Sequence, residues 1–242
     1  MTRAPLPRLE GAVELLDRAD NSDAEVGENL RDIERLNRYF GGIRAVLRHL
    51  RRLISDQPGA RLEILDIGTG GADIPRAICR WARRRAVAVT IEALDRSEQV
   101  LAVAREWSAD YPEIRLRRAD APRLPHPDRS FDFATSSQLL HHLTEAEGVR
   151  LLREMRRVAR RGVIVTDLVR SRRAYILTTI AIRLLRTSRL TRNDAPMSVL
   201  RAYRPDEVRR MAAEAGLSDA TISFHPWFRF ALVKEIVSQR GV

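Results

Sequence analysis

The sequence predicts an α/β fold built on a parallel β-sheet. Between residues 60 and 168, short runs rich in β-branched residues alternate with segments of helical periodicity, which is typical of βαβ units. A chain of 242 residues, of which 44% are hydrophobic, is long enough to bury the core that such a sheet needs. We expect strands at 61–67, 88–95, 113–118, 131–135 and 162–167, and helices at 73–84, 97–108 and 144–160.

The segments that flank this alternating core carry patterns of their own. Residues 1–30 are polar and become acidic toward their end, so we expect a flexible N-terminal arm. Residues 31–55 are amphipathic, and the Gly41–Gly42 pair predicts either two helices or one kinked helix. From 170 to 204 we expect a helix at 173–188 and then a polar loop that contains Pro196. Residues 31–242 are thus expected to form a single domain, with 31–55 and 170–204 as a helical cap.

The last part of the chain predicts one more helix and a hairpin. The helix opens at Pro205, where proline suits the first turn, and it ends at Gly216. Two further runs, 219–224 and 228–237, flank His225–Pro226–Trp227 and are typical of a closing β-hairpin.

Composition excludes several classes of protein. No run approaches 18 uncharged apolar residues, so we expect no spanning helix, and the first ten residues lack the apolar stretch of a secretory signal. The single cysteine, Cys79, excludes a disulfide scaffold and a cysteine-rich metal site. We therefore expect a cytoplasmic protein, and we expect no metal.

The formal net charge is +11, and every basic residue except Lys234 is an arginine. A basic surface attracts phosphates, but nucleic-acid binding usually clusters its arginines on one face together with aromatic side chains. Here the arginines are scattered and only 5% of the residues are aromatic. A solvated arginine-rich surface or a coding bias is the plainer interpretation, and an RNA substrate is kept as an alternative.

The sharpest motif is LEILDIGTGGAD at 62–73, in which an apolar strand ends at Asp66 and is followed by Gly68, Gly70 and Gly71. Glycines there let the backbone turn tightly and approach a ligand, and the next helix presents free N–H groups. The following strand, TIEALD, ends at Asp95, where a carboxylate would hold both hydroxyls of a ribose. A dinucleotide fingerprint would place its third glycine at Asp73, where a carboxylate repels a pyrophosphate, so NAD is disfavoured.

Asp66-x-Gly68-x-Gly70 instead resembles the first motif of class I S-adenosylmethionine (SAM) methyltransferases. In that family the acidic residue and the glycine backbone receive the amino-acid end of the cofactor. The resemblance covers about 60–168 and implies SAM as the cofactor. It also implies a Rossmann-like, doubly wound seven-stranded sheet in the order 3-2-1-4-5-7-6, with the last strand antiparallel. Ala72 stands where the family often has a third glycine, and we expect only a slightly tighter fit there.

Further residues agree with this resemblance. Asp120, with Ala121 beside it, occupies the position where the family reads the adenine amino group. FDFATSS at 131–137 resembles the family's fourth strand, where a backbone carbonyl near Ser136 would hold the ammonium of the cofactor. The alternative is that Asp95 and Asp120 merely cap helices or turns.

Methyl transfer to a hydroxyl needs a group that takes up its proton, and histidine suits this task because its usual pKa is near neutrality. His141 and His142 follow the fourth predicted strand and are catalytic candidates, as is His225 in the hairpin turn. Each of them has a structural alternative, such as ordering a loop or forming an aromatic wall. Asp167, at the end of the fifth strand, is a candidate for holding a substrate hydroxyl or for capping a helix.

The acceptor is predicted only by class. Enzymes that methylate amino groups of bases typically carry a proline pair after the fourth strand, whereas this chain has SSQL at 136–139. The stretch SSQLLHHL resembles small-molecule methyltransferases of quinone and polyketide biosynthesis, which implies an oxygen or activated carbon on a small, fairly apolar aromatic acceptor. The apolar helix at 173–188 is interpreted as a buried helix, as a lid over such an acceptor, or as a weak contact with a membrane surface. An RNA methyltransferase, a non-catalytic SAM-binding regulator and, more distantly, an NAD-dependent reductase are the alternatives.

Overall fold

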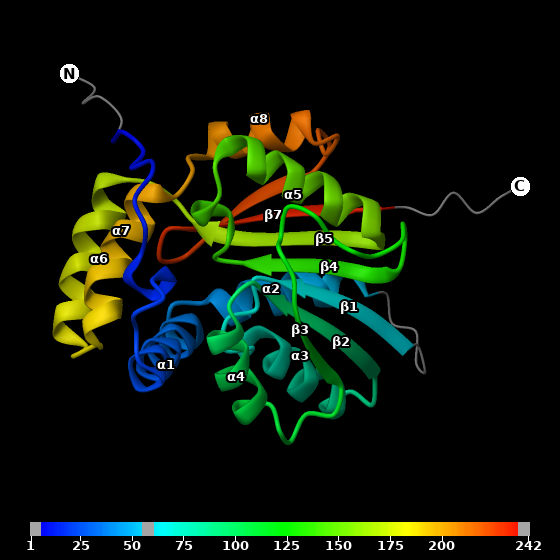
Figure 1. The fold of residues 1–242 in the computed structure, drawn as a ribbon. Helices are drawn as coiled ribbons and strands as arrows, with labels where there is room; N and C mark the ends of the chain where they lie inside the picture. The colour runs from blue at the N-terminus through cyan, green and yellow to red at the C-terminus, as the bar shows by residue number, and fades with distance from the viewer. Residues whose placement is uncertain (1–5, 55–60, 237–242) are drawn as a thin grey trace, which may run out of the picture.

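The sheet has seven strands in the order β3-β2-β1-β4-β5-β7-β6 (Figure 1). The computed structural model describes residues 6–54 and 61–236. β1 to β5 are mutually parallel, and β7 runs antiparallel to both β5 and β6. The strands are β1 (Arg61–Ile67), β2 (Ala88–Asp95), β3 (Ile114–Arg118), β4 (Phe131–Ser137), β5 (Ala159–Leu168), β6 (Thr221–His225) and β7 (Arg229–Glu235). The predicted strand order and the antiparallel last strand are confirmed.

Helices cover both faces of the sheet. On one face, a core cluster joins α2 and α3 to β1 and β2 through residues such as Leu50, Ile64 and Ile78. On the other face, a second cluster joins α5 and α8 to β4 and β5 through Leu152, Val163 and Met211. The helices are α1 (Asp23–Tyr39), α2 (Gly42–Leu53), α3 (Asp73–Arg84), α4 (Glu98–Trp107), α5 (Glu145–Val158), α6 (Arg172–Leu184), α7 (Arg189–Arg201) and α8 (Pro205–Glu214). Two short 3-10 turns, Leu15–Asp17 and Leu140–His142, complete the assignment.

The amphipathic segment predicted at 31–55 is two helices. Gly41 has a φ of 82° and caps the start of α2, and this left-handed conformation favours glycine. The first helix begins earlier than expected, at Asp23, because Ser22 and Glu25 form a capping box there. Residue 55 lies outside the described residues.

The predicted loop around Pro196 is wrong, because Pro196 lies inside α7. The helix begins at a good cap, since the Ser188 side chain accepts a hydrogen bond from the backbone N–H of Thr191. Its buried residues include Leu190 and Val199, so packing outweighs the backbone bond that proline cannot make. The helix predicted at 173–188 ends at Leu184, which leaves a short turn before α7.

α6, α7 and the arm lie together at one end of the sheet. In Figure 1 the arm (dark blue) passes between the α6–α7 pair and the sheet. α6 is covered on one side only, because Ile176, Ile180 and Leu184 are exposed. No helix among residues 6–54 and 61–236 combines the length and the apolar character needed to cross a membrane.

Candidate active site

A cavity of about 690 Å³ lies where β1, β2 and β4 end. Its floor includes the loop from Gly68 to Gly71, and its roof includes Leu16 of the arm, Phe40 after α1 and Leu177 of α6. Open parallel sheets bind ligands at this carboxyl edge, and small-molecule sites usually measure about 300–1,000 Å³. The cavity therefore has the position and the size of a small-molecule site.

The loop after β1 is shaped by its glycines. Gly68 and Gly70 have φ angles of 71° and 54°, a region in which glycine alone is unstrained. A Cβ added to Gly68 would lie 2.9 Å from a side-chain carbon of Leu139, so the close packing there also requires glycine. The loop backbone thus reaches the cavity without side chains in between.

Asp66 lies beneath this loop at the end of β1. Its side chain is buried, and the Thr135 hydroxyl donates a hydrogen bond to its Oδ1 at 2.7 Å. Burial raises the pKa of Asp66 to about 6. Asp66 also lines the cavity, so it is placed to support the loop and to receive a polar ligand group.

Asp95 ends β2 and faces the cavity from the neighbouring strand. Its carboxylate accepts hydrogen bonds from the backbone N–H groups of Gly70 and Ser97, both at 3.0 Å. Burial raises the pKa of Asp95. A carboxylate oxygen has two lone pairs, so both oxygens retain acceptor capacity for the hydroxyls of a ribose. The acceptor oxygens of Asp95 therefore fit the ribose hydroxyls of SAM.

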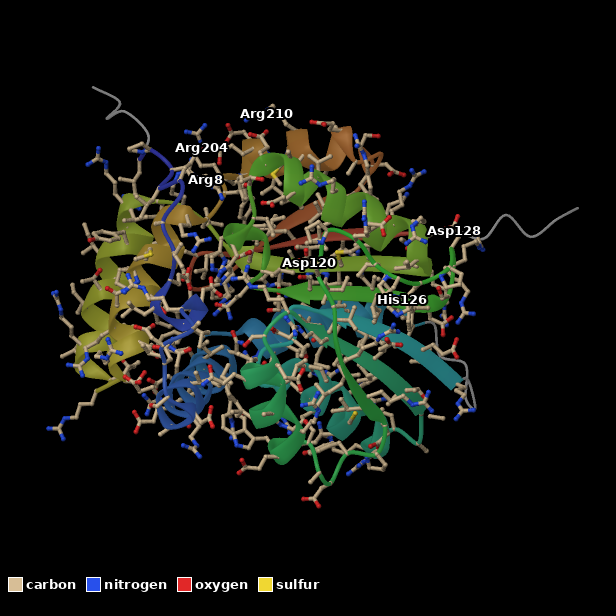
Figure 2. All side chains as sticks on the ribbon, viewed as in Figure 1. Arg8, Asp120, His126, Asp128, Arg204 and Arg210 are labelled. Atoms are coloured by element: carbon tan, nitrogen blue, oxygen red, sulfur yellow. The ribbon has the colours of Figure 1, made fainter. Side chains whose placement is uncertain are left out.

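The structure also brings Asp120 and Ala121 to this cavity, whereas the side chain of Ser136 is turned away from it, so only a backbone carbonyl near Ser136 stays a prediction. Figure 2 shows Asp120 near the middle of the molecule, well apart from His126 and Asp128. The hydroxyl of Ser136 is buried and donates to the carbonyl of Ile67 at 3.0 Å. Its neighbour Ser137 lines the cavity.

Ala72 differs from our expectation of a merely tighter fit. It is fully buried with a φ of 57°, so the residue that replaces the family's third glycine adopts a left-handed conformation. This conformation costs a non-glycine residue about 1–2 kcal/mol. The strain lies at the start of α3, next to the cofactor loop.

His141 is buried and held by two carboxylates. Its Nδ1 lies 2.7 Å from Oδ1 of Asp167, and its Nε2 lies 3.6 Å from Oε1 of Glu14. Burial alone would lower the pKa of His141, but Asp167 and Glu14 outweigh it and raise the pKa to about 9. At neutral pH His141 therefore already carries its proton, and it is suited to hold its neighbours in place rather than to accept a proton.

His142 is the half-buried neighbour of His141 and lines the same cavity. Its Nδ1 lies 3.2 Å from Oδ2 of Asp17, and hydrogen bonding to His142 helps to lower the pKa of Asp17 against the effect of burial. Because the Asp17 carboxylate can only accept, Nδ1 of His142 carries the hydrogen of this contact, and in the neutral form of the ring Nε2 is the nitrogen with the lone pair. The arrangement resembles the imidazole–carboxylate pairs of acid–base catalysts.

Glu14, His141 and His142 form a cluster whose possible ligand atoms all lie within 4.8 Å of one another. Such a group has the chemistry to hold a metal ion. However, Nη1 of Arg201 lies 3.4 Å from Oε1 of Glu14, and His141 is itself positively charged. Because Arg201 already pairs with Glu14, and a protonated His141 has no lone pair to give a metal ion, we interpret the cluster as a hydrogen-bonded network and not as a metal centre.

His225 is the one candidate histidine that does not line the cavity. It ends β6, and its Nε2 lies 3.0 Å from Nε2 of His49 in α2. Burial lowers the pKa of His225. Its neighbours Trp227 and Phe228 do line the cavity, so an aromatic wall is present there although His225 itself faces elsewhere.

Several cavity residues were absent from the sequence-based prediction. Glu14 and Asp17 lie in the arm that was expected to be flexible, and Asp194 and Arg229 come from α7 and β7. The one signal for Arg229 was a charged residue at the start of an otherwise apolar strand, RFALV. No local pattern links the other three, because they meet only through the packing of distant segments.

Comparison with known proteins agrees with this geometry. Residues 64–162 match the family model of the methyltransferase domain. A demethylmenaquinone methyltransferase of Lysinibacillus sphaericus is 32% identical over 116 residues, which are 46% of this chain and 45% of that protein. The chain spans less than half the length of the curated relatives it matches.

Solved structures show the same fold. A SAM-dependent methyltransferase from Aquifex aeolicus has a TM-score of 0.61 at 16% identity and covers 90% of this chain and 100% of its own. Human N-acetylserotonin methyltransferase, solved with SAM, has a TM-score of 0.63 at 16% identity, covering 88% of this chain and 56% of its own. The resemblance inferred from the motifs is therefore confirmed: residues 64–162 match the model of a methyltransferase domain, and the fold is that of solved SAM-dependent methyltransferases.

Proposed function

We propose that this chain transfers the methyl group of SAM to a hydroxyl, or to an activated carbon, of a small and fairly apolar aromatic acceptor. The observation that carries this proposal is that a single cavity is lined both by His142 and by the predicted cofactor residues other than Ser136. A cofactor, an acceptor and a proton-accepting group could therefore meet within this one cavity.

The proposed cofactor contacts follow from the polar groups that line the cavity. The backbone of Gly68 and Gly70 approaches the amino-acid end, Asp95 accepts from the ribose hydroxyls, and Asp120 faces the adenine. When bound, SAM supplies a methyl group on a positively charged sulfur. The carboxylates of Asp66, Asp73 and Asp95 in this part of the cavity favour a cationic ligand.

His142 is proposed to take the proton of the acceptor hydroxyl at Nε2. Asp17 orients the imidazole and stabilises its charged form, and Glu14 lies 3.6 Å from the same Nε2. A positioned base contributes roughly two to four powers of ten in rate. Holding the acceptor in line with the methyl group contributes roughly 7–11 kcal/mol.

The apolar roof supports an aromatic acceptor. Leu16, Ile33, Leu36 and Phe40 line it from the arm and α1, and α6 adds further apolar side chains. The relative from Lysinibacillus is named for demethylmenaquinone, and the human structure for N-acetylserotonin, both of which are ring compounds.

The charge of the cavity argues against RNA as the acceptor. More acidic residues than arginines line the cavity. The acidic residues are Glu14, Asp17, Asp66, Asp73, Asp95, Asp120 and Asp194, and the arginines are Arg18, Arg96 and Arg229. A phosphate chain would meet net repulsion at this entrance.

The test uses methyl-tritiated SAM and an extract of the source organism divided into a lipid-soluble fraction and an RNA fraction. We expect label in the organic phase, loss of that label with Asp95→Ala, and a fall of about 10²–10⁴ in kcat with His142→Gln. His225→Gln is the matched control, because His225 lies outside the cavity and its loss should leave kcat unchanged. Label in RNA would overturn the acceptor class, and loss of activity in EDTA would turn the Glu14 cluster into a metal site.

A further inference from the structure

Arg229 stands apart from the other buried arginines of the described residues. Arg76, Arg170 and Arg201 each lie against a glutamate, at 2.7, 2.7 and 3.4 Å. Arg229 is equally buried, with 4% of its surface exposed, yet no carboxylate within residues 6–54 and 61–236 lies within 4.0 Å of it. A buried charge without a counter-ion is costly, so this contrast needs an explanation.

The hydrogen bonds of Arg229 are also incomplete. Nη2 donates to Oδ1 of Asn37 at 3.2 Å, whereas Nε and Nη1 are buried and have no partner among the described residues. These two nitrogens carry three N–H donors. Burial lowers the pKa of Arg229 to about 10, so the side chain is still positively charged at neutral pH.

The nearest acids are occupied by other groups. Asp167 accepts from His141 and from the backbone N–H of Leu168 at 2.7 Å, and Asp73 accepts from Asn37 at 2.9 Å. Asp167 and Asp73 support the charge of Arg229 from a distance, but neither pairs with it. The remaining space in front of Arg229 is the cavity, which it lines.

An aromatic wall adjoins Arg229 in the same cavity. Trp227 and Phe228 directly precede it, and the ring of Trp227 packs edge-on against Phe40 with 5.0 Å between centroids. Trp227 and Phe228 have φ angles of 64° and 56°, a strained conformation for bulky residues. Strain of this kind is typical of segments that present side chains to a ligand.

From these observations we propose that Arg229 is the anchor for a carboxylate on the aromatic acceptor, with Phe40, Trp227 and Phe228 against its ring. The inference rests on the proposed function, because it names the chemical class of the molecule that is methylated. An aromatic acid satisfies both observations at once: its carboxylate neutralises the guanidinium and accepts its free N–H groups, and its ring fills the apolar wall. A neutral acceptor would leave the buried charge unpaired.

The test compares two ligands that differ only in charge, 1-hydroxy-2-naphthoate and 1-hydroxy-2-naphthamide, by calorimetry on the full chain saturated with S-adenosylhomocysteine. The wild type is expected to bind the acid at least tenfold more tightly than the amide. Arg229→Met is expected to lower the affinity for the acid at least tenfold and to remove the preference. Arg18→Met is the matched control, because Arg18 lines the same cavity but is exposed, and its loss should leave the preference in place.

The carboxylate of the cofactor could occupy the site at Arg229 in place of an acceptor carboxylate. A second pair of ligands distinguishes these two possibilities. If Arg229→Met weakens S-adenosylhomocysteine tenfold but leaves methylthioadenosine unchanged, Arg229 holds the amino-acid end of the cofactor and the proposal is overturned. Equal binding of the acid and the amide by the wild type also overturns it. This comparison uses the wild type alone, so it does not depend on whether a variant folds.

These outcomes are distinct from a failure of the proposed function. A preference for the acid without methyl transfer to any extract would reject the function and keep the anion site. Methylation of a neutral lipid without a preference for the acid would keep the function and reject the site.

Discussion

The two walls of the cavity are held by different kinds of contact. The wall that we propose for the cofactor consists of short loops that leave β1, β2 and β3, and neighbouring loops hold it, as in the bond between Gly70 and Asp95. The wall that we propose for the acceptor is assembled from the arm, α1, α6, α7 and the hairpin. Its hydrogen bonds join residues that are far apart in the sequence. The backbone N–H groups of Leu15 and Leu16, for example, donate to Asp194, which is 179 and 178 residues away. The cofactor wall is thus a property of the sheet, whereas the acceptor wall depends on distant side chains.

The largest effect we predict is on the cofactor wall. Asp95→Ala removes the acceptor of two ribose hydroxyls, each worth about 1.5–3 kcal/mol, so affinity for S-adenosylhomocysteine should fall roughly 10²–10⁴-fold. Calorimetry measures this change. Asp194→Ala, on the other wall, is the control and should leave that affinity within about twofold. Equal losses in both variants would show that the two walls are not separable.

The next largest effect is on stability, at the buried pair of His141 and Asp167 behind these walls. Asp167→Asn leaves His141 buried with its main counter-charge removed, and breaking a buried pair costs about 3–5 kcal/mol. Urea unfolding measures this loss. The double variant with His141→Gln should lose less than the sum of the single changes, because the two residues interact directly. Additive losses would reject the pair as the source of the effect.

The same pair predicts a pH dependence. The pKa of His141 is raised to about 9 in the fold from its usual value near 6.5, so its contribution is complete below pH 6.5 and is lost as the pH rises through 9. The free energy of unfolding should fall over this window by an amount on the order of 3 kcal/mol. His141→Gln should flatten the fall, and an unchanged slope in that variant would contradict the assignment.

Loosening the arm should affect the use of the acceptor and leave KM for SAM unchanged. Asp194→Ala removes the carboxylate that accepts from Leu15 and Leu16 at 2.8 and 3.0 Å, which carries Glu14 and Asp17 away from His142. We expect kcat/KM for the acceptor to fall about tenfold, equivalent to roughly 1.4 kcal/mol. Asn193→Ala, which removes only a neighbouring bond to Asp194, is the control in steady-state kinetics. A rise in KM for SAM instead would place the arm on the cofactor side.

The smallest predicted effects are on stability, and they differ in sign between two glycines, one inside α1 and one between α1 and α2. Gly41 has a φ of 82°, so Gly41→Ala should destabilise the fold by about 1–2 kcal/mol. Gly27 lies inside α1, and a Cβ there would meet nothing within 4 Å, so Gly27→Ala should stabilise by about 0.5–1 kcal/mol. Thermal melting reads both, and the same sign for the two would contradict the conformational argument.

The contrast between the walls also explains what the sequence can predict. The strands and the loop at Gly68 follow from local patterns, because each depends on residues close together in the chain. The order of the strands was implied only by the family resemblance that the motifs carry. The helix through Pro196 could not be predicted from local patterns, because the packing of buried neighbours overrides the tendency of proline to end a helix. Glu14, Asp17 and Arg229 reach the cavity through contacts between distant segments, and a single sequence carries no signal of such contacts.

The place of β7 has a consequence for how the chain is made. β7 lies between β5 and β6, although β6 precedes it in the sequence, so β6 has no partner in the sheet until β7 has been synthesised. Arg229 is the first residue of β7. A nascent chain therefore completes the cofactor loop long before the residue that we propose as the acceptor anchor. Until then, the edge of β5 that β7 will cover is unpaired, and such an edge can pair with another chain.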